Sequence, residues 1–229
     1  MVSKLPKGEG SAAWLLDYLL GQTLEGYERS IKLTMGEVLD RRYLGGVAFN
    51  RVQRKGVLEI CRRLDIPRPL VDLMSAEAED PDVVHFGYEG APQHDIFKVY
   101  FEYAQRARNA GCDADYVLHR AFKWDARRPE RHTVATYRCI AGLDSVGQRR
   151  RISGLLGRTE FAAMMGRFLD LTHARCPVLP MYLEVSEEGN FRSSFDLNVH
   201  DSDLSIAAIH PVLGKYFLPR RDLIDRALA

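Results

Sequence analysis

Strict alternation of apolar and polar residues marks two stretches of the chain as β-strands. In residues 97–102, Phe-Lys-Val-Tyr-Phe-Glu, large apolar side chains alternate with Lys, Tyr and Glu. Residues 195–200, Phe-Asp-Leu-Asn-Val-His, repeat the pattern with Asp, Asn and His. A period of two directs successive side chains to opposite faces of a strand. Each stretch therefore predicts a strand with one core-facing side and one polar side.

Similar segments occur in pairs that are separated by short loops, as expected for β-hairpins. Residues 83–88 and 94–103 form the first pair, and residues 116–124 and 131–140 form the second, around the charged loop 125–130. Residues 178–186 and 191–200 form the third pair around Glu187-Glu188-Gly189-Asn190, whose residue types are typical of a turn. The chain is thus predicted to contain three hairpins and six strands.

Helical periodicity fills most of the remaining chain. Near the N-terminus it covers residues 11–24, 27–42, 49–64 and 70–79, with Gly45-Gly46 expected to end the second helix. Residues 148–173 are expected to be helical in two parts, with Thr159 as a cap. Residues 204–217 and 219–228 complete the pattern. The first 80 residues are therefore expected to be mostly helical.

Hairpins that alternate with helices predict an α+β fold, with an antiparallel sheet of about six strands and the helices on one face. A helical N-terminal region, residues 1–80, would precede a hairpin-helix domain, residues 81–229, in one continuous domain. The apolar strand face would meet the helices. The polar strand face is then the surface on which function is sought.

Composition limits the classes of partner. With 229 residues, 46% of them hydrophobic, the chain is long enough to bury a sizeable core. The 32 basic and 31 acidic residues give a net charge of +1, so neither nucleic acid nor a membrane is expected as a partner. Four scattered cysteines without a C-x-x-C pair indicate reduced thiols, and the N-terminal sequence has no apolar signal segment. A cytoplasmic location is expected.

If the alternation holds, the polar strand face collects ionisable residues from all three hairpins. Its members are Lys98, Tyr100, Glu102, His119, Lys123, Arg138, Tyr182, Glu184, Asp196, Asn198 and His200. One interpretation is an ordinary solvated sheet face. Asp and Asn are depleted in strands, however, so their alternate positions before His200 favour a functional surface.

The residue types suggest a division of roles on this face. Lys98 and Arg138 would hold an anionic group, and Tyr100, about 7 Å from Lys98 along the strand, would orient it. Other substrate contacts would come from the remaining polar residues, His119, Lys123, Tyr182 and Asn198. The candidate acids and bases are Glu102, Asp196 and His200.

The hairpin-plus-helix layout with a Lys98-x-Tyr100 strand is similar to that of barrel-type aromatic prenyltransferases. This similarity covers isolated strands, and the chain is short for the five repeats of that family, so we do not assign it to the family. The resemblance implies a diphosphate substrate held on an inward polar face.

Other chemistries lack sequence support. Asp196-x-Asn198-x-His200, completed by His85 or His119, would offer metal ligands, but no established metal-binding spacing is present. We therefore assign no metal and leave the cofactor open. The chain also lacks a G-x-S-x-G elbow, a P-loop and a G-x-G-x-x-G fingerprint.

Two functions follow as hypotheses. The first is a small-molecule enzyme of natural-product type that binds an anionic substrate on the polar sheet face, with transfer from a phosphate or diphosphate substrate as the candidate reaction. The alternative is a non-catalytic accessory or assembly protein that docks another protein, which predicts an exposed apolar patch around Trp14 and Tyr18. A homodimer through the N-terminal helices is compatible with both.

Overall fold

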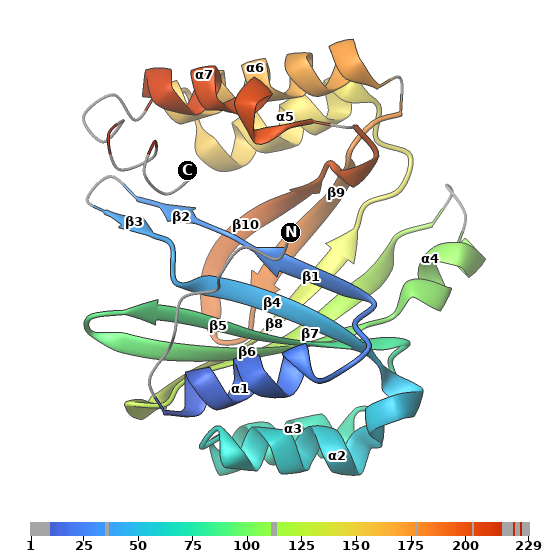
Figure 1. Ribbon diagram of the computed structural model, residues 1–229. Coiled ribbons are helices and arrows are strands. Elements are labelled where there is room, and N and C mark those ends of the chain that lie inside the picture. Colours follow the sequence, from blue (N-terminus) through green and yellow to red (C-terminus); the bar gives the residue numbers. More distant parts are fainter. Residues whose placement is uncertain are drawn as a thin grey trace. The chain divides into compact units, whose positions relative to one another are not determined.

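The computed structural model describes residues 10–34, 37–110, 114–176, 178–202 and 204–216, together with Asp222 and Asp225 (Figure 1). The chain divides into two compact units. The first unit comprises Met1–Lys32, Leu39–Arg108 and Leu118–Ala135, and the second comprises Leu33–Val38, Asn109–Val117 and Thr136–Ala229.

The strands form one eight-stranded and one two-stranded sheet. The hydrogen-bonded order of the large sheet is β1-β4-β5-β6-β7-β8-β9-β10, and β2 pairs with β3. Their bounds are Gly26–Arg29 (β1), Lys32–Leu33 (β2), Val38–Leu39 (β3), Arg42–Ala48 (β4), Val83–Ala91 (β5), His94–Glu102 (β6), Tyr116–Asp125 (β7), Arg128–Cys139 (β8), Met181–Glu187 (β9) and Asn190–Asn198 (β10). The helices are α1 (Ser11–Leu20), α2 (Phe49–Arg63), α3 (Arg68–Ala76), α4 (Ala104–Ala110), α5 (Ser145–Leu156), α6 (Glu160–Arg175) and α7 (Ile206–Tyr216), with a 3-10 turn, η1, at His200–Ser202.

The core of the first unit lies between one face of its strands and the helices α1, α2 and α3, which lie together on that side (Figure 1). Alternate residues of β5 and β6 supply this face, and the antiparallel register places Phe86 opposite Val99. Phe97 and Trp124 pack nearby, and the Trp124 indole donates a hydrogen bond of 2.8 Å to the Leu64 carbonyl after α2. The apolar face of the alternating pattern is thus buried, which leaves the polar residues of the same strands on the other face.

Helix α2 ends in a Schellman motif. The backbone N–H of Ile66 donates to the Cys61 carbonyl, and that of Asp65 donates to the Arg62 carbonyl. Asp65 has a φ of 57°, in the left-handed region that favours glycine. The motif satisfies the last carbonyls of the helix and turns the chain toward α3.

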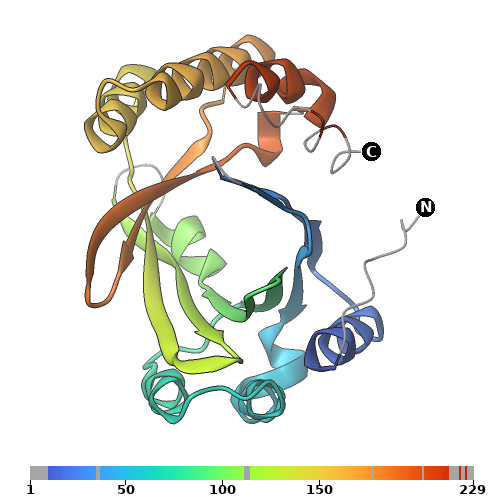
Figure 2. The ribbon, with the colours of Figure 1, turned by 90° about the vertical axis from the view of Figure 1, so that its left-hand side faces the viewer.

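In the second unit, α5, α6 and α7 lie side by side (Figure 2). Asp144 and Thr159 cap α5 and α6 by accepting hydrogen bonds from the backbone N–H groups of Gly147 and Ala162. Ile152 and Leu169 of these helices share a buried cluster with Tyr182 of β9. The pair β9–β10 therefore has a face that is covered by helices.

Several sequence predictions are confirmed. The fold is α+β with an antiparallel sheet, each of the three predicted hairpins forms, and the two-part helix appears as α5 and α6. The sheet has eight strands instead of about six. The predicted helix over 219–228 lies almost entirely outside the described residues.

The helix predicted over residues 27–42 is wrong. Strands β1, β2 and β3 occupy this stretch, and Gly45-Gly46, expected to end a helix, lie inside β4. Pairing with distant residues explains the difference, because β4 pairs with both β1 and β5, so Gly46 lies opposite Gly26 and His85. The apolar spacing of Ile31, Val38 and Leu39 fits a helix locally, but tertiary pairing overrides that preference.

Two further expectations concern compartment and domain boundaries. Within the described ranges, no helix is long and apolar enough to span a bilayer. Cys61, Cys139 and Cys176 are free thiols, and Cys112 lies outside the described residues. The expected division of the chain at residue 80, within one continuous domain, stays a prediction.

Candidate functional site

A row of polar side chains follows the strand face opposite the core of the first unit. The face is defined by register, because His85 lies opposite Tyr100, and Glu102 lies opposite His119. We call this set the polar strand face; its members on β5, β6 and β7 are His85, Glu89, Lys98, Tyr100, Glu102, His119 and Lys123. Five of these are residues that the sequence predicts for the site.

Glu89 is the centre of the first cluster on this face. Its side chain is only 4% exposed, and its carboxylate accepts hydrogen bonds from Lys32 (2.9 Å), Arg42 (3.1 Å) and Lys98 (2.7 Å). His94 Nε2 lies 3.9 Å from the same carboxylate. Strands β2, β4 and β6 each bring one of the three cations to the end of β5.

Positive charge exceeds negative charge in this cluster. Burial of Glu89 opposes ionisation, but Lys98, Lys32 and Arg42 override it and lower the pKa of Glu89 to about 2. Burial, together with the nearby charges of Arg42 and Lys123, lowers the pKa of Lys98 to about 8 although Glu89 opposes this shift. Lys123 lies directly opposite Lys98 on β7. Three cations therefore contact one carboxylate, which is the electrostatic pattern of an anion site.

His85 and Glu102 form the second cluster. Nε2 of His85 lies 2.5 Å from Oε2 of Glu102, and both side chains are mostly buried. The hydrogen bond to His85 makes the largest contribution to the lowered pKa of Glu102. A carboxylate that accepts from Nε2–H fixes the ring orientation and leaves Nδ1 as the position where the neutral imidazole can take a proton.

Two aromatic rings border this pair. The His119 ring lies 6.2 Å from the ring of His85 and 6.2 Å from that of Tyr100, in edge-on arrangements with both. Burial makes the largest contribution to the pKa of His119, which is lowered to about 4. His119 is therefore neutral near pH 7.

Gly46 makes room for His85. A Cβ atom at Gly46 would lie 2.7 Å from His85 Nδ1, closer than side-chain atoms approach one another. The glycine thus allows the ring to lie against β4, with Nδ1 close to the Gly46 backbone. Glycine inside a strand often marks a place where another group approaches the backbone closely, as the His85 ring does here.

The two clusters lie on the same strands. Glu89 and His85 are four residues apart on β5, as are Lys98 and Glu102 on β6, a separation of about 13 Å. A ligand of that length would contact the cationic cluster at one end and His85 at the other. Among the residues that the structure describes, no group of three or more His, Cys, Asp or Glu side chains is arranged to hold a metal ion.

The other predicted site residues belong to the second unit. Arg138 and Asp196 are exposed on β8 and β10, and Asn198 is the last residue of β10. His200 lies in η1 beyond the strand, where its backbone N–H donates to the Asn198 side chain. Tyr182 is 1% exposed and stacks on Phe195 in the core, where it gains more from ring packing than it would on the expected polar face.

Sequence reasoning missed Glu89, Arg42 and Lys32, and it considered His85 only as a metal ligand. The expected strand ended at Tyr88, one residue before Glu89, although continued alternation from Val84 would have placed both His85 and Glu89 on the polar side. Arg42 escapes notice because the local pattern of residues 27–42 predicts a helix, whereas Arg42 begins the strand β4. Nothing in the local sequence indicates that Lys32, 57 residues away, contacts Glu89.

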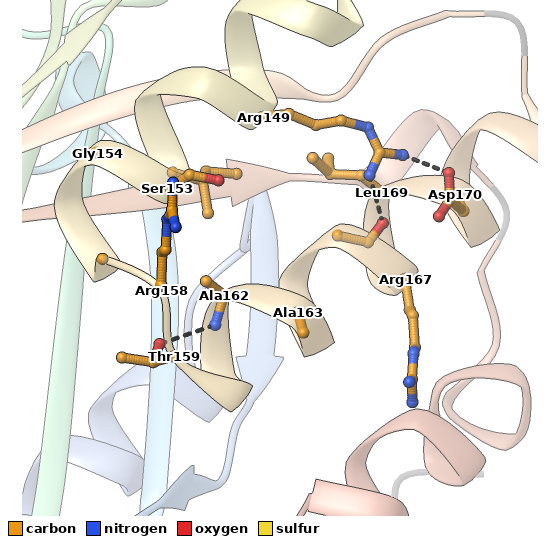
Figure 3. A pocket seen from close by; sticks show the side chains of 13 residues that line it. Arg149, Ser153, Gly154, Arg158, Thr159, Ala162, Ala163, Arg167, Leu169 and Asp170 are labelled. Atoms are coloured by element: carbon orange, nitrogen blue, oxygen red, sulfur yellow. Dashed lines mark hydrogen bonds and ion pairs between the residues drawn. The ribbon is translucent and has the colours of Figure 1, made fainter.

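A second region of interest is a cavity of about 820 Å³ along α5 and α6, which has three arginines in its lining (Figure 3). The Arg149 side chain is turned toward Asp170 and the Gly166 carbonyl, whereas the Arg167 side chain extends away from Arg149 and Asp170 (Figure 3). The guanidinium groups do not converge on one point. We therefore regard the polar strand face as the stronger candidate site.

Comparisons with known proteins identify no relative. No protein-family model, no curated protein and no solved structure matches the chain. The function is accordingly argued from the residues and their geometry.

Proposed function

We propose that the polar strand face binds a small molecule with an anionic group of the phosphate or diphosphate type, and that the protein is a cytoplasmic transferase acting on it. The three cations that contact Glu89, together with Lys123 opposite Lys98, would hold the anionic group, and His85 would transfer a proton at the other end of the face. This proposal extends the small-molecule enzyme hypothesis and replaces Asp196 and His200 by His85 as the acid or base.

The surplus of cations around Glu89 is the observation that carries the proposal. A single buried carboxylate would be neutralised by one partner, but Lys32, Arg42 and Lys98 all contact it. The charge of Lys123, which lies opposite Lys98, disfavours the ammonium form of Lys98 and so costs electrostatic free energy. A bound dianion would reverse that cost, because each phosphate oxygen accepts hydrogen bonds from such groups.

The pair His85 and Glu102 supports a role in proton transfer. In a transfer reaction, His85 Nδ1 would accept the proton of the attacking group while the cations stabilise the departing phosphate or diphosphate. Glu102 would stabilise the imidazolium that forms, as a carboxylate does when it orients a catalytic histidine. Tyr100, between Lys98 and Glu102 on β6, would lie beside the bound ligand.

Calorimetric titration with pyrophosphate, followed by thermal unfolding, tests this proposal. Pyrophosphate at about 100 times its Kd should raise the free energy of unfolding by about 2.7 kcal/mol. Lys123→Gln should weaken binding about tenfold or more, since it removes one charge-assisted contact. Lys55→Gln, an exposed lysine on α2, is the control and should bind as the wild type does.

Equal binding by both variants would place the anion elsewhere, for example beside the arginines of α5 and α6. Absence of any pyrophosphate or phosphate binding would refute the anionic-substrate proposal. His85→Gln separates binding from chemistry, because it should leave pyrophosphate affinity within about twofold while removing the proton acceptor.

The alternative, a docking protein, receives no support from the helix that suggested it. Trp14 and Tyr18 are half-buried and pack on the core of the first unit, and the Arg63 guanidinium lies 4.2 Å from the centre of the Trp14 ring. The apolar stripe of α1 is thus used inside the first unit, with Leu20 left exposed. A homodimer through α1 remains a proposal that sedimentation analysis can test.

A further inference from the structure

The cavity along α5 and α6 in the second unit has the size of a ligand site and walls that leave room for one. Its volume is about 820 Å³, within the range of small-molecule pockets. Among the described residues, a Cβ atom added at Gly154 or Gly157 would meet no non-neighbouring atom within 4 Å, and one at Gly166 would meet only the Arg149 guanidinium, at 3.3 Å. Small residues thus keep the space beside the helices open.

Positive charge dominates the lining of this cavity. Three arginines and one carboxylate line it, which leaves a surplus of two positive charges. The carboxylate, Asp170, is paired with Arg149, which also donates a hydrogen bond of 3.1 Å to the Gly166 carbonyl. Arg158 and Arg167 are exposed, and neither has a hydrogen-bond or ion-pair partner within the described ranges. Their guanidinium groups are therefore available to a ligand.

These two arginines lie on different sides of the cavity (Figure 3). Arg158 comes before α6 and extends toward Ser153, whereas Arg167 lies two turns into α6. Two turns correspond to about 11 Å along the helix axis. One small anion would contact only one of the two guanidinium groups. Two anionic groups that are joined by a spacer would contact both.

The donors around the cavity fit phosphate groups. A guanidinium presents a planar fork of N–H donors that matches two phosphate oxygens, and its charge strengthens both hydrogen bonds. Ser153 and Thr159 add hydroxyl groups near Arg158. The Thr159 oxygen accepts a hydrogen bond from the backbone N–H of Ala162 (3.1 Å), so its own O–H can be turned toward a ligand.

We propose that this cavity binds a small molecule with two phosphate groups on a spacer, one phosphate contacting Arg158 and the other contacting Arg167. Arg149 stays paired with Asp170 and forms part of the wall between them. The site shares no residue with the polar strand face. It is therefore independent of the proposed function, and either can fail alone.

Three synthetic probes separate a two-phosphate site from a single-phosphate site. Octanediol bisphosphate carries its phosphates on a long spacer, propanediol bisphosphate carries them on a short one, and octyl phosphate carries a single phosphate. Calorimetric titration of the full chain should give a Kd below about 1 mM for octanediol bisphosphate. The other two probes should bind at least tenfold more weakly, because each reaches only one guanidinium at a time.

Matched variants locate the binding surface. Arg158→Gln and Arg167→Gln should each weaken the binding of octanediol bisphosphate at least tenfold, to the level of octyl phosphate. Arg150→Gln removes an exposed arginine of α5 outside the lining and should leave the affinity within twofold. Ala163→Phe fills the cavity from an exposed position of α6 without removing a charge, and it should also weaken binding at least tenfold. Circular dichroism checks that each variant is folded.

Four outcomes would overturn the proposal. Absence of binding by octanediol bisphosphate would exclude the site. Equal loss in Arg150→Gln would show a general attraction to basic surface. Unchanged binding by Ala163→Phe would place the ligand outside the cavity. Binding that is lost in Lys123→Gln and retained in the Arg158 and Arg167 variants would place the probe on the polar strand face.

Discussion

Glu89 stays ionised in a nearly solvent-free position because three cationic side chains contact it. Its carboxylate pKa, lowered to about 2, couples this local arrangement to the stability of the first unit. A buried pair of this kind is costly to break, since removal of one partner leaves the other charge without compensation. Glu89 should therefore tolerate substitution poorly even in the absence of ligand, because its loss leaves Lys98 and Arg42 without their shared counter-charge.

We expect acid to destabilise the wild type through Glu89. The carboxyl has a lower pKa in the folded chain than the ordinary value of 4.5, so the unfolded chain binds the proton first as the pH falls. The free energy of unfolding should drop by about 3 kcal/mol between pH 5 and pH 2 from this group. Urea denaturation should show a smaller drop for Glu89→Gln, which is already less stable at pH 7, whereas Glu59→Gln on the exposed side of α2 should follow the wild type.

His119 should titrate well below ordinary histidines. Burial lowers its pKa from 6.5 to about 4, so the folded chain takes up this proton later than the unfolded chain. Stability should consequently fall by about 3 kcal/mol as the pH drops from 6.5 to 4. An NMR titration of the ring gives the midpoint directly, and a midpoint at or above 6 would contradict the described burial.

At the scale of elements, the close approach of β4 and β5 sets the position of His85. Gly46→Ala should push the ring away from Glu102 and destabilise the first unit by roughly 1 to 3 kcal/mol, as overpacking does. Gly26→Ala is the matched control, because Gly26 lies opposite Gly46 and a Cβ there meets nothing within 4 Å. Thermal unfolding of both variants distinguishes steric displacement from a general loss of glycine. Equal effects would argue against the contact with His85.

The end of α2 offers a stabilising change. Asp65 holds a left-handed conformation at the position where a Schellman motif favours glycine. Asp65→Gly should raise the free energy of unfolding by about 1 kcal/mol, because the strained φ is relieved. Asp65→Ala, which keeps a Cβ and loses the polar side chain, should lower it. Chemical denaturation of the pair decides whether the backbone conformation is the cause.

An element can be predicted from the sequence when its hydrophobic pattern is clear within the element and its pairing partner is the neighbouring strand in the sequence. The hairpins containing Phe97–Phe101 and Phe195–Val199 were predictable because each strand alternates over many residues and pairs with its neighbour in sequence. Strand β1 was not, since all four of its residues are exposed and show no alternation. Its structure depends on pairing with β4, and neither helical spacing nor turn residues report such a distant partner.

At the scale of the whole molecule, both tryptophans, Trp14 and Trp124, belong to the first unit. Their fluorescence therefore reports on that unit, whereas circular dichroism reports on helices of both. Leu169→Ala, in the buried cluster of the second unit, should lower stability by about 2 to 5 kcal/mol in the circular dichroism transition. The tryptophan midpoint should move less. Identical shifts would show that the chain unfolds as one cooperative body.

The candidate site was predictable only in part for a similar reason. Lys98, Tyr100 and Glu102 follow from alternation along one strand, and His119 and Lys123 from the strand beside it. Their partners Lys32, Arg42 and Glu89 come from segments that meet only in the folded chain. The sequence also assigns Arg138, Tyr182, Asp196, Asn198 and His200 to the same face, although they belong to the second unit. Alternation gives the face of a strand on which a residue lies, but it does not give the neighbours of that strand in space.

Burial, together with the nearby charge of Arg42, lowers the pKa of Lys98 and gives its amine an unusual reactivity. An ordinary lysine, with a pKa near 10.4, is almost wholly an ammonium ion at pH 8 and a poor nucleophile. Lys98, with a pKa of about 8, is an uncharged amine in about half of the molecules at that pH. Acylating reagents should therefore modify it ahead of exposed lysines once they reach it, and a bound anion should shield it. Covalent labelling of this single amine would then serve as a footprint of whatever ligand the protein takes.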